Sequence, residues 1–236
     1  MELKVIAYAH NGHTDKFGIP RQSREESPIL TRIVFEPDYR IPESLRGIDG
    51  YSHLWLLWGF SEVQRTDWSP TVRPPRLGGN TRMGVFATRS PFRPNPIGLS
   101  SVRLVAIEDG ELIVSGADVL DGTPIYDIKP YLSFSDSHPD ARNGFADETK
   151  DYRLKVDGEV RRTDVRCTKD VRREERTKGD SVLESTWQEI CYILSQDPRP
   201  AYQDDPEREY KMDYAGYRIT FTVKETTVTV KKIEKI

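Results

Sequence analysis

The chain has 236 residues, of which 36% are hydrophobic and 31% charged, and its formal net charge is -3. This composition is typical of a folded globular protein and excludes a disordered chain. The longest uninterrupted apolar run, Leu54–Trp58, is far shorter than the ~20 residues of a membrane-spanning helix. The negative net charge argues against attraction of the whole surface to nucleic acid, but it leaves room for a local basic face.

The start of the chain, Met1–Lys4, has no basic segment leading into a long apolar stretch, so we expect no signal peptide. Cys167 and Cys191 lack the C-x-x-C spacing of metal or redox sites, and they are typical of free thiols in a reducing compartment. His10 and His13 have no cysteine partners nearby, and we expect no metal site. Together these features favour the cytoplasm.

The first half of the chain predicts short strands separated by turns. Apolar runs with β-branched or aromatic residues are bounded by Gly, Pro, Asn and Asp, and no helical pattern intervenes. We expect Tyr51–Phe60 to be a strand that is buried on both faces. The other expected strands are Leu3–Tyr8, Ile29–Phe35, Met83–Ala87, Val102–Ile107, Leu112–Ala117 and Ile125–Leu132. The fold class predicted from them is mainly β, with a small closed barrel as an N-terminal domain over residues 1–140.

A polar segment between Ser133 and Asp151 indicates a change of domain, and residues 141–236 predict a small α+β domain. Its clearest helix starts at a capping box, Ser181-x-x-Glu184. One face of that helix is apolar, with Leu183, Trp187, Ile190, Cys191 and Leu194. Tyr217–Val223 and Thr227–Ile233 predict a pair of strands. The basic run Arg161–Lys178 is either a solvated helix face or a contact for tRNA.

Three segments carry side chains suited to binding. Pro20-Arg21-Gln22 places multi-donor side chains after a rigid proline, and Asp118–Tyr131 places three carboxylates around a turn. The long segment Thr71–Gly98 alternates proline and arginine, and no acidic residue lies between Asp67 and Glu108. Arginines held on such a backbone suit carboxylates or phosphates, which a guanidinium binds with two hydrogen bonds.

These segments resemble the signature of one protein family. Gly84–Ser90, followed by Arg93-Pro94-Asn95-Pro96-Ile97-Gly98, is similar to the central motif of the TsaA-like (TrmO/YaeB) family. The segments Pro20–Gln22, Gly50–Trp55, Thr71–Asn80 and Asp118–Tyr131 match the same family in the same order. The resemblance covers residues 3–135, and Gln196–Tyr202 matches the C-terminal domain of its longer members.

The resemblance implies a β-barrel enzyme that uses S-adenosylmethionine and acts as a homodimer. Its implied reaction is methylation of the exocyclic amine of N6-threonylcarbamoyladenosine, beside the anticodon of threonine tRNA. The implied cofactor-binding residues are Pro20, Arg21, Gln22, Ser61, Glu62, Arg89, Leu99, Asp118, Val119, Leu120 and Asp121. Many members have a histidine where Ser61 stands, so a side-chain role at that position does not carry over.

The chemistry of methyl transfer agrees with this reading. Asp118 or Asp121 can accept hydrogen bonds from an ammonium group or a ribose, and Arg89 can bind a carboxylate. The adenine amine is a weak nucleophile, and an acceptor near its N–H would assist it. Asn95 and Asp127 are the catalytic candidates we name, while the sequence leaves Asp118 and Asp121 open for the same role. Two alternatives remain: a non-catalytic module that binds RNA or senses S-adenosylmethionine, and an enzyme acting on another small anion.

Overall fold

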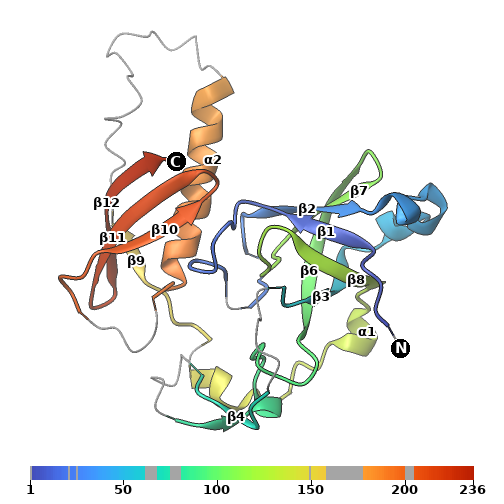
Figure 1. The fold of residues 1–236 in the computed structure, drawn as a ribbon, viewed down its shortest axis with the longest axis horizontal. Coiled ribbons are helices and arrows are strands. Elements are labelled where there is room, and N and C mark those ends of the chain that lie inside the picture. The colour runs from blue at the N-terminus through green and yellow to red at the C-terminus, as the bar shows by residue number, and fades with distance from the viewer. Residues whose placement is uncertain are drawn as a thin grey trace. The chain divides into compact units, whose positions relative to one another are not determined.

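The computed structural model describes residues 2–20, 22–24, 26–61, 68–74, 81–148, 150–157, 178–199 and 205–236. The chain divides into two compact units (Figure 1). Met1–Asn11 and Pro20–Asp151 form most of the first unit. The second unit comprises Gly12–Ile19, Tyr152–Arg199 and Asp204–Ile236. No helix within these described ranges is long and apolar enough to cross a membrane.

The first unit is built around a closed antiparallel barrel. Among the described residues its strand order is β1-β2-β7-β6-β3-β8. The strands are β1 (Ala7–His10), β2 (Leu30–Phe35), β3 (His53–Gly59), β6 (Ile97–Glu108), β7 (Glu111–Ser115) and β8 (Thr123–Pro130). The mainly β fold class with a closed barrel, predicted from the spacing of the strands, is therefore confirmed.

Short elements fill the connections of the barrel. Between β2 and β3 lie three 3-10 turns, η1 (Pro37–Tyr39), η2 (Pro42–Leu45) and η3 (Ile48–Gly50). Between β3 and β6 lies a small two-stranded sheet of β4 (Thr71–Val72) and β5 (Met83–Gly84), followed by the turn η5 (Val85–Ala87). After β8 come the short helix α1 (Ser133–Asp136) and the turn η6 (Gly144–Glu148).

The barrel core follows from alternation along each strand. In β3, Leu54, Leu56 and Trp58 point inward and are buried. They meet inward-facing residues from the other strands: Ala7, Ala9, Ile33, Phe35, Val102, Leu112, Val114 and Ile125. The prediction that this strand is buried on both faces is wrong, because its outward residues are only partly buried. Outward Trp55 is covered on one side by Tyr131 and donates a hydrogen bond of 2.8 Å to Asp136.

Three predicted strands have different bounds in the structure. The first strand begins at Ala7 rather than Leu3, because the ladder with β2 starts at the Ala7–Phe35 pair. The predicted strand Met83–Ala87 ends at Gly84, and its remainder forms η5 outside the barrel. The next strand of the barrel, β6, begins at Ile97 instead of Val102.

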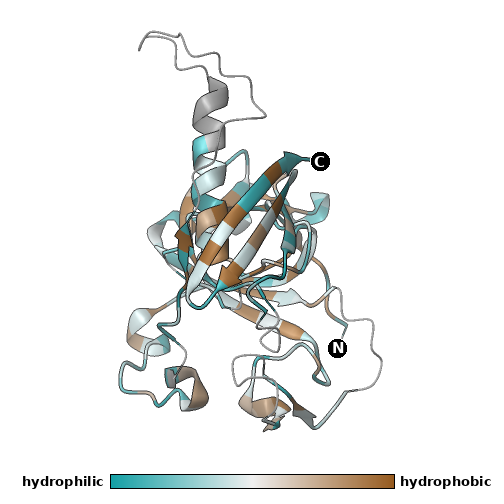
Figure 2. Cartoon of the chain, turned by 90° about the vertical axis from the view of Figure 1, so that its left-hand side faces the viewer, coloured by the Kyte–Doolittle hydropathy of each residue, from teal (hydrophilic) through white to brown (hydrophobic). Residues whose placement is uncertain are grey.

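The second unit is an α+β fold. Its sheet has the order β10-β11-β12-β9 in the described residues, formed by β10 (Tyr210–Tyr214), β11 (Tyr217–Lys224), β12 (Thr227–Lys235) and β9 (Lys155–Asp157). The predicted pairing of the last two strands is confirmed. Figure 2 shows apolar residues recurring along the strands that lead to the C-terminus. Strands β9 and β10 are additional to the predicted ones.

Helix α2 (Lys178–Ser195) begins three residues before the predicted capping box, so the N-cap predicted at Ser181 is wrong. The predicted apolar face holds at Ile190 and Leu194, which are buried together with Ile193. The basic run predicted from Arg161 lies outside the described residues as far as residue 177.

Candidate functional site: one rim of the barrel

The topology gathers the motif segments at one end of the barrel. Because neighbouring strands are antiparallel, the ends of β1, β3 and β7 share a rim with the starts of β2, β6 and β8. For example, Trp58 near the end of β3 pairs with Gly98 at the start of β6 and with Ile125 at the start of β8. The connections β1–β2, β3–β6 and β7–β8 therefore all emerge at this rim, which we call the motif rim.

Each cofactor-binding residue implied by the resemblance that the structure describes lies on these connections or at the start of β6. The β1–β2 connection carries Pro20 and Gln22, and the β3–β6 connection carries Ser61 and Arg89. Asp118 to Asp121 form the β7–β8 connection, and Leu99 is near the start of β6. The positions of Arg21 and Glu62 lie outside the described residues. Residues far apart in sequence are thus brought to one end of the barrel.

Asp118 is the most constrained side chain at the motif rim. The hydroxyl of Ser100 donates a short hydrogen bond to Asp118 Oδ1, and Trp58 Nε1 donates to the same hydroxyl at 2.8 Å. Burial raises the pKa of the Asp118 carboxyl above the usual aspartate value, against the opposing effects of the Ser100 hydrogen bond and the positive charge of Arg89. A carboxylate held at an energetic cost inside a cluster of motif segments is a candidate for function.

Arg89 is the cationic partner of this carboxylate. Its Nη1 donates a hydrogen bond of 2.6 Å to the side-chain oxygen of Gln22. This contact joins the β3–β6 connection to the β1–β2 connection. The positive charge of Arg89 also acts on Asp118, which lies on the third connection, β7–β8. The guanidinium is exposed, so its remaining donors are available to an anionic group.

Asp121 is fixed at the tip of the β7–β8 turn. Its Oδ1 accepts a hydrogen bond of 3.1 Å from the backbone N–H of Asn11 and lies 3.2 Å from His10 Nδ1. Gly122 has a φ of 75°, as the third position of this turn requires, and Thr123 N–H closes the turn on the Leu120 carbonyl at 3.2 Å. The carboxylate remains partly exposed, which leaves it accessible to a ligand.

The remaining predicted residues have different surroundings. Val119 packs its side chain into the barrel core, so its backbone is the part available to a ligand. Leu99 is 52% exposed and presents an apolar surface beside the rim. Asn95 is exposed in the turn before β6. Asp127 lies within β8, where its carboxylate pairs with Lys129 at 2.7 Å and accepts the N–H of Ile128.

Sequence reasoning missed Ser100 and Trp58 as partners of Asp118. Ser100 is fully buried and occupies an inward-facing position of β6, whose neighbouring inward residues are apolar or glycine. A polar residue at such a position needs a hydrogen-bond partner. This alternation is the signal that would have pointed to it.

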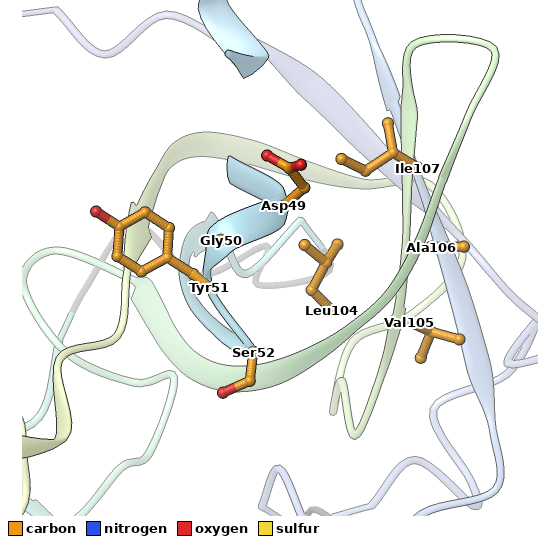
Figure 3. A pocket seen from close by; sticks show the side chains of 8 residues that line it. All are labelled: Asp49, Gly50, Tyr51, Ser52, Leu104, Val105, Ala106 and Ile107. Atoms are coloured by element: carbon orange, nitrogen blue, oxygen red, sulfur yellow. The ribbon is translucent and has the colours of Figure 1, made fainter. Parts of the chain in front are cut away.

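A hollow of about 500 Å³ lies at the other end of the barrel (Figure 3). It is lined by Asp49–Ser52, just before β3, and by Leu104–Ile107, near the end of β6. Since these residues belong to the rim opposite the motif rim, the hollow is separate from the cluster around Asp118.

Comparison with known proteins gives the class of the chain. Residues 8–137 match the model of the tRNA-methyltransferase O N-terminal domain, and residues 161–236 match that of the TrmO C-terminal domain. The matched regions define a tRNA methyltransferase built on a β-barrel. The chain belongs to the tRNA-methyltransferase O family, and the resemblance predicted from its motifs is confirmed.

Relatives match over most of the chain. The tRNA (adenine(37)-N6)-methyltransferase of Escherichia coli K12 is 38% identical over 214 residues, which are 87% of this chain and 85% of the relative. A protein of the same name from Eikenella corrodens is 43% identical, over 78% of this chain and 97% of the relative. The crystal structure of TrmO from Pseudomonas aeruginosa superposes with a TM-score of 0.74 at 30% identity, covering 99% of this chain and 98% of that one.

Proposed function

We propose that this protein transfers the methyl group of S-adenosylmethionine to N6 of the adenosine at position 37 of tRNA. The names of two relatives describe methylation at N6 of adenine 37 of tRNA, and a third is named a putative S-adenosylmethionine-dependent methyltransferase. The observation that carries the proposal is the cluster at the motif rim, where Arg89 and Asp118 stand together on a barrel of this family. We also propose that the reaction takes place in the cytoplasm, where tRNA is available as a substrate.

The residues at the rim fit the cofactor by their chemistry. S-adenosylmethionine ends in an ammonium and a carboxylate, so its site needs an anionic acceptor and a cationic donor. Asp118 and Asp121 would accept from the ammonium or the ribose hydroxyls, and Arg89 would bind the carboxylate. Leu99 would supply part of an apolar wall. When bound, the cofactor supplies a methyl carbon that its sulfonium already activates, so the protein contributes chiefly by positioning.

The adenine amine loses a proton during the reaction, and a nearby acceptor would take part in that step. Asn95 and Asp127 stay our candidates for this role. The exposed amide of Asn95 is free to turn toward a nucleobase, whereas Asp127 would first have to leave Lys129. Comparison of Asn95→Ala with Asp127→Asn at saturating cofactor would separate them, since loss of the acceptor lowers kcat.

We infer further that the adenosine already carries a threonylcarbamoyl group, so that the product is its N6-methylated form. That group ends in a carboxylate, and the β3–β6 connection offers arginines beyond Arg89, such as Arg82 and Arg73. Arginine binds a carboxylate with two charge-assisted hydrogen bonds. Equal methylation rates of modified and unmodified tRNA would contradict this substrate choice.

We also propose a homodimer that buries the outer face of β6. Four apolar side chains of this strand are exposed, Ile97 and Leu99 at one end and Val105 and Ile107 at the other, with Ser101 and Arg103 between them. Exposed apolar side chains gathered on one face are candidates for an interface. Ile107→Lys should convert the dimer to a monomer in light scattering, because a charge would be buried without a partner. Leu3→Lys, at an exposed leucine outside β6, is the control. A monomeric wild type would refute the proposal.

The central experiment uses the full chain, methyl-labelled cofactor and tRNA extracted from cells that lack the protein. We expect label in N6-methylated threonylcarbamoyladenosine when the nucleosides are separated by mass spectrometry. The alternative, a module that senses S-adenosylmethionine without turnover, predicts binding of the cofactor and no labelled nucleoside.

A further inference from the structure

Two large aromatic side chains face solvent in the β3–β6 connection. Phe86 is 78% exposed and Trp68 is 49% exposed. Their ring centroids are 6.2 Å apart and their planes differ by 28°, so the rings are nearly parallel neighbours. Apolar side chains that are gathered on an exposed surface are candidates for a binding site. We call Trp68 and Phe86 the aromatic pair.

Hydrogen bonds hold the backbone beneath the aromatic pair. Val85, which precedes Phe86, is buried, and its N–H donates to the carbonyl of Pro70 at 3.0 Å. This bond connects the segment of Trp68 to the segment of Phe86. Arg93 Nη2 donates to the carbonyls of Val85 at 3.1 Å and Thr88 at 2.8 Å, which fixes the η5 turn. The two rings are therefore carried by a backbone that hydrogen bonds hold in place. Binding of a ligand would cost little entropy for ordering this segment.

The segment that carries the aromatic pair is rich in arginine. Residues 68–107 contain six arginines and no lysine, aspartate or glutamate. Arg82 lies on the strand segment leading into η5 and donates to the Thr71 hydroxyl at 2.8 Å. Arg89, three residues after Phe86, belongs to the motif rim. This charge complements phosphates, and the combination of aromatic faces with arginines is the usual means of binding single-stranded nucleic acid.

We propose that the aromatic pair is a stacking platform for an unpaired nucleobase of the anticodon loop, next to the adenosine that is methylated. This inference rests on the proposed function and adds to it a site for a second base. The exposed face of Phe86 extends the stack that Trp68 begins, and the nearby arginines bind the flanking phosphates. The target base must leave its stack in the loop to enter the motif rim. The platform would stack its neighbour on an aromatic ring and so keep the loop open.

The test measures binding of an anticodon stem–loop RNA, with 2-aminopurine beside the target adenosine, to the full chain. Stacking on an aromatic side chain contributes about 1–3 kcal/mol per base, so Phe86→Ala should raise Kd about five- to 150-fold. Phe86→Leu should lose nearly as much, because it keeps apolar area and lacks a π face. Phe86→Tyr should bind within about twofold of wild type, since stacking tolerates any aromatic ring.

A matched control and a second readout complete the design. Phe134 is 88% exposed, and it follows β8 at the opposite rim, so Phe134→Ala should leave Kd unchanged. The 2-aminopurine fluorescence should change on binding to wild type and to Phe86→Tyr, and much less with Phe86→Leu. The alternative is that the aromatic pair contacts a second copy of this chain instead of RNA. Light scattering on each variant tests this alternative, and a change of oligomeric state in Phe86→Ala would overturn the platform.

The outcomes separate the platform from the proposed function. If wild type methylates tRNA while Phe86→Ala and Phe86→Leu bind RNA as tightly as wild type, the platform is wrong and the function stands. If wild type fails to methylate tRNA, the proposed function is wrong, whereas the affinity ratios among the variants still support or overturn the platform.

Discussion

Asp118 offers the sharpest test of the cofactor site, through the substitution Asp118→Asn. The amide oxygen can still accept the hydrogen bond from Ser100, so the contact to β6 is retained while the negative charge is removed. Losing a charge-assisted contact to the ammonium of the cofactor costs about 1.5–3 kcal/mol. That corresponds to roughly ten- to 150-fold weaker binding, which titration calorimetry with S-adenosylmethionine resolves easily.

The pH dependence of the same binding supplies a second measurement. Burial raises the pKa of Asp118, so protonation begins at a higher pH than for an ordinary aspartate. The affinity of wild type should fall as the pH is lowered through this raised pKa, because the protonated carboxyl no longer attracts the ammonium. Asp118→Asn should show no such decline in the same range.

Stability distinguishes a lost contact from a damaged fold. A carboxyl whose folded pKa is raised contributes stability in full below its unfolded pKa, and this contribution is lost as the pH rises through the folded pKa. Above its raised pKa the ionised Asp118 therefore destabilises the protein, and there Asp118→Asn should melt at the same temperature or higher. Asp140→Asn, at an exposed carboxylate, is the control. Wild-type affinity in Asp118→Asn, with an intact circular dichroism spectrum, would refute this role of Asp118.

Two further predictions concern stability. Gly98→Ala should lower it by about 1–3 kcal/mol in urea unfolding, because the added methyl would overlap the buried indole of Trp58; an unchanged midpoint would show that Trp58 can move aside. Burial lowers the pKa of His13 to about 4, so the second unit should lose about 3 kcal/mol of stability as the pH falls from 6.5 to about 4, and His13→Asn should abolish this dependence. An equal loss in wild type and variant would assign the effect to other groups.

Much of the barrel could be predicted because its strands are short apolar runs bounded by turn residues. The run Tyr51–Phe60 agrees with β3 within a few residues, but it did not show that only Leu54, Leu56 and Trp58 face inward. Such runs do not reveal which strands are neighbours. That β3 lies between β6 and β8 depends on pairing between residues 38 to 76 positions apart, which no local pattern encodes.

The second unit was harder to predict for a related reason. Its sheet includes the edge strand β9, which has three residues and pairs in parallel with β12, far away in sequence. Residues 12–19 also join this unit although they follow β1 of the barrel. Gly12 and Gly18 allow this segment to lie against Tyr214 and Met212, where a side chain would overlap them. His13, considered among the possible metal ligands, instead packs edge-on against Tyr214 at 5.1 Å.

For the candidate site too, local sequence indicated the residues but not their arrangement in space. The motif residues could be named from the sequence, because their segments match the signature of a known family in the same order. Their common location could not, since it depends on three connections of an antiparallel barrel emerging at one rim. The partners of Asp118 illustrate this point: Ser100 lies 18 positions away and Trp58 lies 42 positions from Ser100.

The way Arg89 is held explains how one rim can serve a ligand with two opposite charges. A direct ion pair between Arg89 and Asp118 would neutralise both groups, and a ligand would have to break it. In the structure Arg89 donates instead to the neutral side chain of Gln22, and Asp118 is held by the neutral hydroxyl of Ser100. Each charge is thus positioned by an uncharged partner, which leaves the carboxylate for an ammonium and the guanidinium for a carboxylate. The raised pKa of Asp118 is the cost of this arrangement, and burial of a charge without a direct counter-ion is the physical reason for it.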